Sequence, residues 1–154
     1  MGDEEEFKKA EKIALRMLVF RDRSEQEIRD KLNQKGFSAS VTEKIITKCS
    51  GHGYLDDRTF AERLARSLFT TKNWGFARIG ATLRDRGVSS ALVKETILQL
   101  REDYSEEEAA LQIMKRRFCR FDFQKASSKE KHLLIQFLRR RGFSWETISR
   151  MLTI

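Results

Sequence analysis

The side chains best suited to catalysis or metal binding are few in this sequence and stand far apart. Its two cysteines are Cys49 and Cys119, and its two histidines are His52 and His132. A tetrahedral metal site needs about four clustered ligands, and the sequence offers no such cluster. It also lacks a phosphate-binding glycine loop and a nucleophile elbow. We therefore predict no catalytic residue, no metal site and no cofactor, and two cysteines that fill the core. The protein is expected not to be an enzyme.

The adjacent carboxylates of Asp56 and Asp57 are the remaining candidates for acid–base or metal chemistry. They directly precede an amphipathic pattern whose first apolar residue is Phe60, and no further ligand lies near them in sequence. Aspartate is a favoured residue at the start of a helix. We therefore expect a structural junction, in which the aspartates cap a helix while Tyr54 and Leu55 pack beside them. The junction motif is Gly53-Tyr54-Leu55-Asp56-Asp57.

Cationic side chains are abundant, and their excess is concentrated in the last third of the chain. The formal net charge is +8, and residues 105–154 hold 11 basic and 6 acidic side chains. The corresponding numbers are 11 and 10 for residues 1–55, and 9 and 7 for residues 56–104. This cluster favours a surface that attracts a polyanion, although Arg141 alone fits a cation that complements the negative end of a helix. The candidate residues are Lys115, Arg116, Arg117, Arg120, Arg139, Arg140 and Arg141.

The elements that position these residues follow from a pattern that occurs three times. Each copy has two apolar residues four positions apart, then a cation, a glycine, an apolar residue and a serine. A glycine just past the end of a helix adopts the left-handed conformation, and the apolar residue after it packs back onto the last turn. The serine can begin the next helix. The turn glycines of the three copies are Gly36, Gly87 and Gly142.

Amphipathic patterns around each copy predict nine helices and no sheet, and a chain without proline suits a helical fold. We predict an all-α protein of three tandem three-helix repeats, at residues 1–55, 56–104 and 105–154, which form an elongated, curved arc. Capping motifs at Ser24, Ser40, Ser105 and Ser127 support the helix starts. The helices are expected near 5–20, 24–35, 40–50, 57–71, 75–86, 90–102, 105–118, 127–141 and 145–152.

The third repeat, which is the most basic, is also longer than the others between its first helix and its glycine. The extra residues lie around Phe118–Lys125, so either a longer loop or a longer first helix fills this segment. Because Phe121 and Phe123 are large and apolar, we expect them to pack onto their own repeat. No apolar run approaches the roughly 18 residues of a membrane span. We therefore expect a cytoplasmic protein that does not bind a membrane.

The three glycine turns and the junction motif together closely resemble the RecX family of bacterial recombination regulators. In that family a stretch like Gly53–Asp57 links the first and second of three tandem three-helix repeats. The segment Arg139–Ser144 resembles the end of the family's third repeat. The resemblance extends from about Ala10 to Leu152. One departure is Val88, where a bulky aromatic residue is usual, and the contact after the glycine tolerates valine.

The resemblance implies a function that composition alone does not supply. It implies a protein that binds the RecA filament on single-stranded DNA along its helical groove. We also expect a monomer with weak non-specific affinity for DNA. Such a protein modulates, and in most cases inhibits, the ATPase, strand-exchange and LexA-cleavage activities of RecA in recombination, DNA repair and the SOS response. Some members stimulate or tune RecA, so the sign of the effect stays open.

A helix-turn-helix DNA-binding protein is the alternative, because three-helix units with a glycine-containing turn also describe that motif. Two features of the sequence argue against it. The repeats are tandem within one chain, whereas helix-turn-helix proteins usually pair two units in a dimer. The first two repeats are also close to neutral, and a recognition helix usually carries Arg, Asn or Gln that faces the bases.

Overall fold

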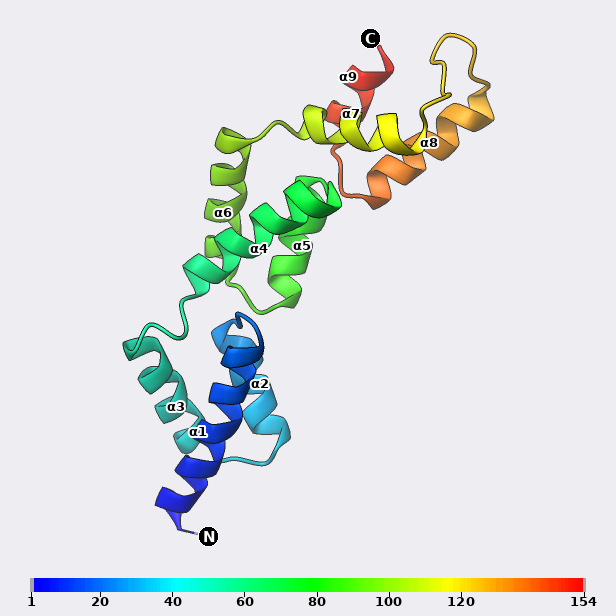
Figure 1. The fold of residues 1–154 in the computed structure, drawn as a ribbon. Coiled ribbons are helices and arrows are strands. Elements are labelled where there is room, and N and C mark those ends of the chain that lie inside the picture. Colours follow the sequence, from blue (N-terminus) through cyan, green and yellow to red (C-terminus); the bar gives the residue numbers. More distant parts are fainter. Residues whose placement is uncertain (1, 154) are drawn as a thin grey trace.

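The computed structural model describes residues 2–153 and folds this part of the chain into nine α-helices without a strand (Figure 1). The helices form three groups, which we call repeat 1 (α1–α3), repeat 2 (α4–α6) and repeat 3 (α7–α9). The predicted all-α fold of three tandem three-helix repeats is confirmed. The helices are α1 (Asp3–Phe20), α2 (Glu25–Gln34), α3 (Ala39–Gly51), α4 (Asp57–Lys72), α5 (Phe76–Asp85), α6 (Ser90–Asp103), α7 (Glu106–Arg117), α8 (Ser128–Arg140) and α9 (Trp145–Leu152).

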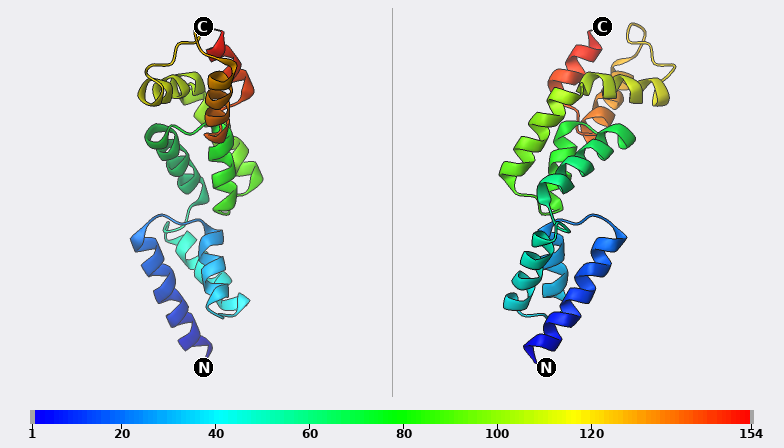
Figure 2. Two further views of the ribbon diagram at one scale, coloured as in Figure 1. Left: turned by 90° about the vertical axis from the view of Figure 1, so that its right-hand side faces the viewer. Right: turned by 60° about the vertical axis from the view of Figure 1, so that its left-hand side comes forward.

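The repeats follow one another along an elongated molecule. Figures 1 and 2 place the N- and C-terminal ends at opposite extremes, with repeat 2 between the other two. The predicted divisions of the chain at residues 55/56 and 104/105 stay predictions. None of the nine helices in the described part is long and apolar enough to cross a membrane.

Each repeat makes the same turn between its second and third helices. The φ angles of Gly36, Gly87 and Gly142 are 86°, 89° and 92°, which is the left-handed region that favours glycine. The amide after each glycine donates to a carbonyl one turn back, in the pairs Phe37–Leu32 (3.1 Å), Val88–Leu83 (3.0 Å) and Phe143–Leu138 (3.1 Å). This is the predicted helix ending, and its three copies are therefore confirmed.

Serine caps begin most of the helices. The predicted caps at Ser24, Ser105 and Ser127 are confirmed, because each hydroxyl accepts the backbone N–H three residues later. The predicted cap at Ser40 is wrong. Ser38, which directly follows the turn, accepts the N–H of Val41 at 3.2 Å, so that α3 has already begun before residue 40. The serine of the turn thus also serves as the cap of the third helix.

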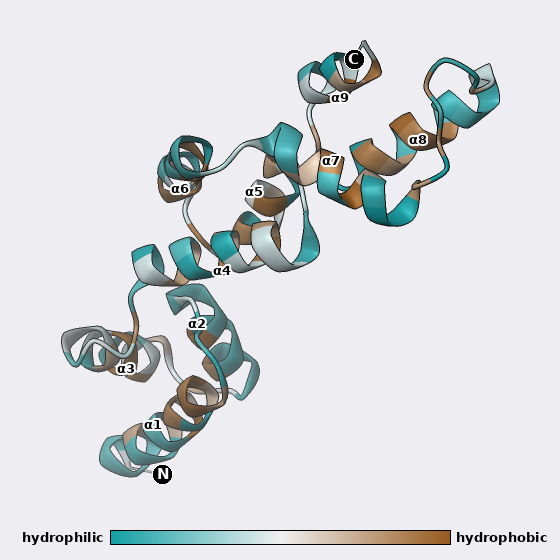
Figure 3. Ribbon diagram, turned by 45° about the horizontal axis from the view of Figure 1, so that its top comes forward, coloured by the Kyte–Doolittle hydropathy of each residue, from teal (hydrophilic) through white to brown (hydrophobic). Residues whose placement is uncertain are grey.

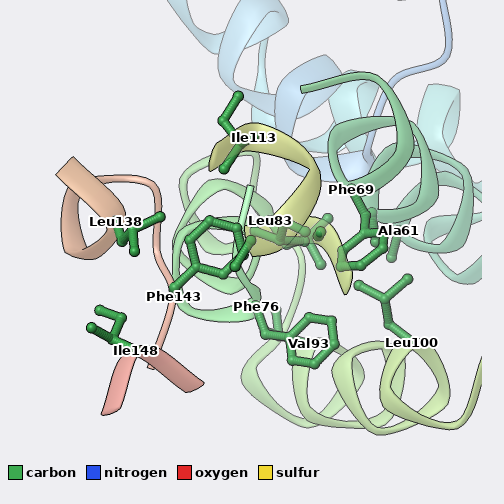
Figure 4. Close-up of a cluster of buried hydrophobic side chains, with 14 of the residues drawn as sticks. Ala61, Phe69, Phe76, Leu83, Val93, Leu100, Ile113, Leu138, Phe143 and Ile148 are labelled. Carbon is green, nitrogen blue, oxygen red and sulfur yellow. The ribbon is translucent and has the colours of Figure 1, made fainter. Parts of the chain in front are cut away.

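The apolar residues form two cores in the described part of the chain, not three. Repeat 1 has its own core, in which Ile28 and Leu32 are fully buried, and Leu55 belongs to it. Repeats 2 and 3 share a second, continuous core. In Figure 4, Phe143 of repeat 3 lies beside Phe76 and Leu83 of repeat 2. Burial of apolar area is the main stabilising force, so repeats 2 and 3 form one body to which repeat 1 is attached.

Hydrophobic and hydrophilic residues are segregated on the helices that build these cores. Figure 3 shows hydrophobic residues on one side of helices such as α4 and α8, and hydrophilic residues on the other. Three helical repeats of about fifty residues each have little core of their own, so the shared core lets repeats 2 and 3 support each other.

The longer segment of repeat 3 is a loop. Helix α7 ends at Arg117, and α8 begins only at Ser128, so the longer-helix alternative is wrong. Phe121 and Phe123 are half-buried, and their rings meet edge to face with 5.0 Å between the ring centres. The rings of Phe118 and of Phe137 in α8 have their centres 5.1 Å apart. These contacts confirm that the loop packs onto its own repeat.

Two expectations about single side chains are wrong. Tyr54 does not pack into the junction: it is 57% exposed and stacks on the exposed ring of His52 at 5.5 Å. Cys119 is exposed in the loop of repeat 3 and is not a core residue. Cys49 is buried as expected, and this burial raises the pKa of its thiol. The loop sequence around Cys119 is rich in aromatic residues, but these residues cover each other instead of the thiol.

Candidate functional site

The two junctions between repeats are built in the same way. In each one, the N-terminus of the second helix of a repeat (α2 or α5) contacts the repeat that follows. The first contact is a carboxylate from the next repeat. Asp57, the first residue of α4, accepts the backbone N–H of Glu25 at 2.9 Å. Glu106, the first residue of α7, accepts the N–H of Phe76 at 3.0 Å. Each carboxylate satisfies a helix N–H that has no partner within its own helix, and its charge matches the positive end of that helix.

The second contact is the glycine turn of the next repeat. At the first junction the hydroxyl of Ser24 donates to the carbonyl oxygen of Arg86, and Gly87 faces the side chain of Gln26. A Cβ atom at Gly87 would lie 2.3 Å from the Cβ of Gln26. Glycine is therefore needed here for two reasons, the positive φ and the close approach.

At the second junction the glycine turn of repeat 3 contacts the start of α5 through hydrogen bonds between backbone groups. Gly75 donates its N–H to the carbonyl oxygen of Arg141 at 2.7 Å, and Ala77 donates to that of Gly142 at 3.2 Å. Gly75, the residue before α5, has no side chain to cap the helix, so the turn of repeat 3 and the carboxylate of Glu106 cap it instead. The start of α5 and the end of α8 thus depend on each other.

The two aspartates of the junction motif have different roles. Asp56 caps α4 by accepting the N–H groups of Arg58 and Thr59, at 3.1 and 3.3 Å. The backbone N–H of Thr59, followed by its hydroxyl, holds the pKa of the exposed Asp56 carboxyl below its usual value. Asp57 caps α2 of the preceding repeat, as described above. The prediction that both residues are structural agrees with this geometry, but the prediction that both cap the following helix is wrong for Asp57.

Alanine at either aspartate is expected to lower the free energy of unfolding by about 1 kcal/mol, the usual value of a helix cap. Amide hydrogen exchange separates the two: Asp56→Ala should speed exchange at Thr59, and Asp57→Ala at Glu25. Because the folded-state pKa of Asp56 is depressed, its stabilisation is present above the unfolded value near 3.8 and is lost as the pH falls through the folded value. Equal effects of both variants on the Glu25 amide would contradict the assignment.

The seven predicted cations lie at the end of α7, in the loop after it, and at the end of α8. All are exposed except Arg141, which is half-buried. Among the residues that the structure describes, no ion pair involves any of them. Their charge is therefore not neutralised by neighbouring carboxylates.

Four of these arginines lie together with a fifth that the sequence analysis missed. Burial, followed by the nearby positive charges of Arg117, Arg78 and Arg116, lowers the pKa of Arg141. Arg78 comes from α5 of repeat 2, and its Nη1 donates to the carbonyl oxygen of Arg140 at 3.4 Å. We call this group the basic surface; it consists of Arg78, Arg116, Arg117, Arg140 and Arg141. Lys115, Arg120 and Arg139 are exposed on the same repeat, but no contact ties them to this group.

Arg78 was missed because nothing around it in sequence is unusually basic. It joins the basic surface only because α5 docks on the turn of repeat 3. The guanidinium of Arg78 lies 3.7 Å from the centre of the Trp74 ring, which holds it in place. The basic surface therefore spans repeats 2 and 3, whereas the sequence assigned it to repeat 3 alone.

Arg141 has a structural role besides its charge. Its Nη1 donates to the carbonyl oxygen of Lys72, at the C-terminal end of α4, at 2.8 Å. The ring of Phe137 also helps to hold it, because the guanidinium groups of Arg117 and Arg141 lie 5.5 and 5.1 Å from the centre of that ring. The sequence analysis allowed that Arg141 complements the negative end of a helix. It does so, but the helix is α4, which belongs to repeat 2.

The basic surface presents hydrogen-bond donors that are suited to binding anions. Within residues 2–153, no group of three His, Cys, Asp or Glu side chains lies close enough to hold a metal ion. Arginine guanidinium groups bind phosphate and carboxylate oxygens through paired hydrogen bonds. The basic surface is therefore suited to contact a polyanion.

Comparison with protein families finds three adjacent models that match nearly the whole chain. They are described as RecX first, second and third three-helix domains, and they match residues 10–49, 56–97 and 105–152. Each match falls on one of the three groups of helices.

Individual proteins with the same description are similar in sequence and structure. Regulatory protein RecX of Syntrophotalea carbinolica is 33% identical over 131 residues, which cover 85% of this chain and 86% of that protein. Regulatory protein RecX of Trichlorobacter lovleyi is 32% identical, with 90% of each chain covered. The crystal structure of RecX from Lactobacillus salivarius has the same fold, with a TM-score of 0.80 at 19% identity, over 97% of this chain and 96% of that one.

Proposed function

The chain belongs to the RecX family, and from this premise we propose that it regulates RecA by binding the RecA filament on single-stranded DNA. The effect is inhibition: bound protein lowers the ATPase, strand-exchange and LexA-cleavage activities of RecA. The protein acts as a cytoplasmic monomer in recombination, DNA repair and the SOS response. It is a non-enzymatic regulator, so its whole effect depends on where it binds and which state of the filament it favours.

The observation that carries this proposal is the basic surface. Five arginines from two repeats lie together, and none of them forms an ion pair within residues 2–153. A nucleoprotein filament presents DNA phosphates and protein carboxylates, and arginine binds both kinds of oxygen. Since the shared core holds repeats 2 and 3 as one body, the arginines keep their spacing before they bind.

The elongated shape supports contact with more than one RecA subunit. The repeats lie in a row, and repeat 1 has a core separate from that of repeats 2 and 3 (Figure 1). We propose that repeats 2 and 3 contact one subunit while repeat 1 contacts the next. A ligand that bridges two neighbouring subunits favours the spacing at which it binds both. It shifts the equilibrium between two spacings of the filament only by the difference in its affinity for them. Holding one spacing slows every activity that needs the subunits to move.

The helix-turn-helix alternative is less well supported. In that motif the N-terminal residues of a recognition helix contact the bases. The first turns of α3 and α6 carry no Arg, Asn or Gln, since they begin with Ala39-Ser40-Val41-Thr42 and Ser90-Ala91-Leu92-Val93. Helix α9 has eight residues, and its Arg150 is paired with Glu107 and Glu146, at 2.9 and 2.5 Å. These helices are poorly equipped to read a base sequence.

The single-stranded-DNA-dependent ATPase of RecA from the same organism tests the proposal. Purified protein is expected to lower the rate at amounts below one molecule per RecA, because one bound molecule restrains two neighbouring subunits. Its own affinity for DNA should fall with salt and be indifferent to sequence. An unchanged ATPase at equimolar protein would contradict the proposal, and selection of a preferred duplex sequence would favour the alternative.

A further inference from the structure

A groove lies between α5 and α6, and none of the five arginines of the basic surface lines it. Its volume is about 430 Å³, within the range of roughly 300–1,000 Å³ that is usual for ligand sites. The turn of repeat 3, at Gly142 and Ser144, closes one end. The apolar lining residues include Val93, Ile97 and Leu98. Leu98 is 60% exposed, which is unusual for a leucine on a helix that otherwise packs well.

Glycine at position 80 leaves the floor of the groove open. Gly80 is buried on α5, opposite Val93 and Ile97 of α6. A Cβ atom there would meet these two side chains at 3.6 and 3.8 Å, which is ordinary contact. Packing therefore does not require a glycine at this position. Its effect is to keep the space between the two helices free.

Three cations surround this apolar floor. Arg84 comes from α5, and Lys94 and Arg101 come from α6; all three line the groove and are exposed. Lys94, Leu98 and Arg101 are four and three residues apart, so they lie on one face of α6. Within residues 2–153, none of the three cations enters an ion pair.

Among the residues that the structure describes, one carboxylate lines the groove, and its hydrogen bonds are already made within the protein. One oxygen of Glu106 accepts the N–H of Phe76 at 3.0 Å. The other accepts the hydroxyl groups of Ser144 and Thr147, at 3.1 and 2.6 Å. With its oxygens held in this way, Glu106 is not available to the cations of the groove, which retain their charge for a ligand.

We propose that this groove binds an acidic amphipathic segment of a protein partner, which inserts large apolar side chains between α5 and α6 and pairs its carboxylates with Arg84, Lys94 and Arg101. The inference rests on the proposed function for the identity of that partner, which is RecA. Amphipathic segments commonly bind in this manner, with apolar anchors in a hydrophobic groove and charges at its rim. Charge complementarity makes the segment acidic.

DNA fits the groove less well. A sugar–phosphate backbone would contact the cations but would leave the apolar floor uncovered, and bases stack on exposed aromatic rings. Phe76 is the aromatic residue that lines the groove, and it is only 8% exposed. The acidic start of this chain does not fill the groove either. It lies at the far end of repeat 1, whereas the groove is in repeat 2 (Figure 1), and Glu4 and Glu5 there pair with Lys8 and Lys9.

The proposal is tested with overlapping fluorescent peptides of about fifteen residues that cover the RecA sequence. Peptides that bind the full-length protein should be acidic and contain at least two large apolar residues. Leu98→Asp, and separately Arg84→Glu with Arg101→Glu, should weaken their binding by about tenfold or more. Leu133→Asp is the matched control: this leucine of α8 is 54% exposed, and binding should change by less than about twofold.

The outcomes separate this inference from the proposed function. If the wild-type protein inhibits the RecA ATPase but no peptide binds, or the groove variants bind as the control does, the groove inference is overturned and the function stands. If the groove variants lose binding to oligo(dT) and keep the peptides, the groove binds phosphates and the inference is likewise overturned. If acidic peptides bind through Leu98 while the ATPase is unaffected, the proposed function fails and the groove assignment stands.

Discussion

Alanine at Gly75 is expected to force repeats 2 and 3 apart and to lower the free energy of unfolding by about 2–3 kcal/mol, as for overpacked cores. The φ angle of Gly75 is −75°, which alanine adopts without strain. Its Cβ atom, however, would lie 2.3 Å from the carbonyl carbon and oxygen of Gly142 and 2.4 Å from the amide nitrogen of Phe143. Backbone cannot move aside as a flexible side chain does, so the junction must open. Urea unfolding measures the loss, and small-angle scattering should show a larger radius of gyration.

Two other glycines separate the effect of backbone strain from that of close packing. Gly36 has the same left-handed φ as Gly142, but a Cβ atom at Gly36 would meet nothing within 4 Å. Gly36→Ala should therefore cost only about 1–2 kcal/mol, the strain of that conformation. Gly142→Ala combines the strain with a contact of 2.4 Å to the Cβ of Arg78, and it should be the most damaging of the three. If Gly36→Ala destabilised the protein as much as Gly142→Ala, close packing at the junction would not be the reason for glycine.

Reversing the charge of Arg116, Arg117 and Arg140 together is expected to abolish most of the effect on RecA. These three arginines of the basic surface are exposed, and no carboxylate of residues 2–153 pairs with them. Each contact to a polyanion that is lost also removes its share of counterion release. The concentration needed for half-maximal inhibition of the RecA ATPase should rise by at least about tenfold. Non-specific binding to single-stranded DNA should fall in parallel and lose part of its salt dependence.

The control for this variant changes net charge equally at the other end of the molecule. Lys12, Arg16 and Lys44 of repeat 1 are exposed and have no ion pair within residues 2–153. The proposed contact of repeat 1 with RecA does not depend on these three side chains. Their replacement by glutamate should therefore shift half-maximal inhibition by less than about threefold if position matters more than total charge. Equal losses in both triple variants would show that the protein is attracted by its net charge, without a localised surface.

Arg141 is best left unchanged in this experiment. Its guanidinium caps α4 through the carbonyl oxygen of Lys72, so Arg141→Glu would leave that group unsatisfied and place a negative charge at the negative end of a helix. Loss of inhibition by such a variant would not distinguish a lost contact with the filament from a weakened junction.

Local chemistry explains why so much of the helical fold could be predicted from the sequence. The glycine turns, the serine caps and the apolar spacing each depend on residues within about one helical turn of each other. All nine helices and the three turns could therefore be predicted from short segments. Ser40 failed as a cap for the same reason: two serines are equally eligible locally, and the turn at Gly36 decides that Ser38 begins the helix.

The sequence by itself determined the helices, the turns and the excess of positive charge near the C-terminal end. Only the tertiary structure decided which of these parts meet. It joined repeats 2 and 3 through one core, assigned Asp57 to a helix of the preceding repeat, and brought Arg78 beside Arg141, a residue far away in sequence. The physical reason is that a junction pairs the start of one helix with a turn and a carboxylate many residues later. Neither segment contains a sequence feature that identifies the other as its partner.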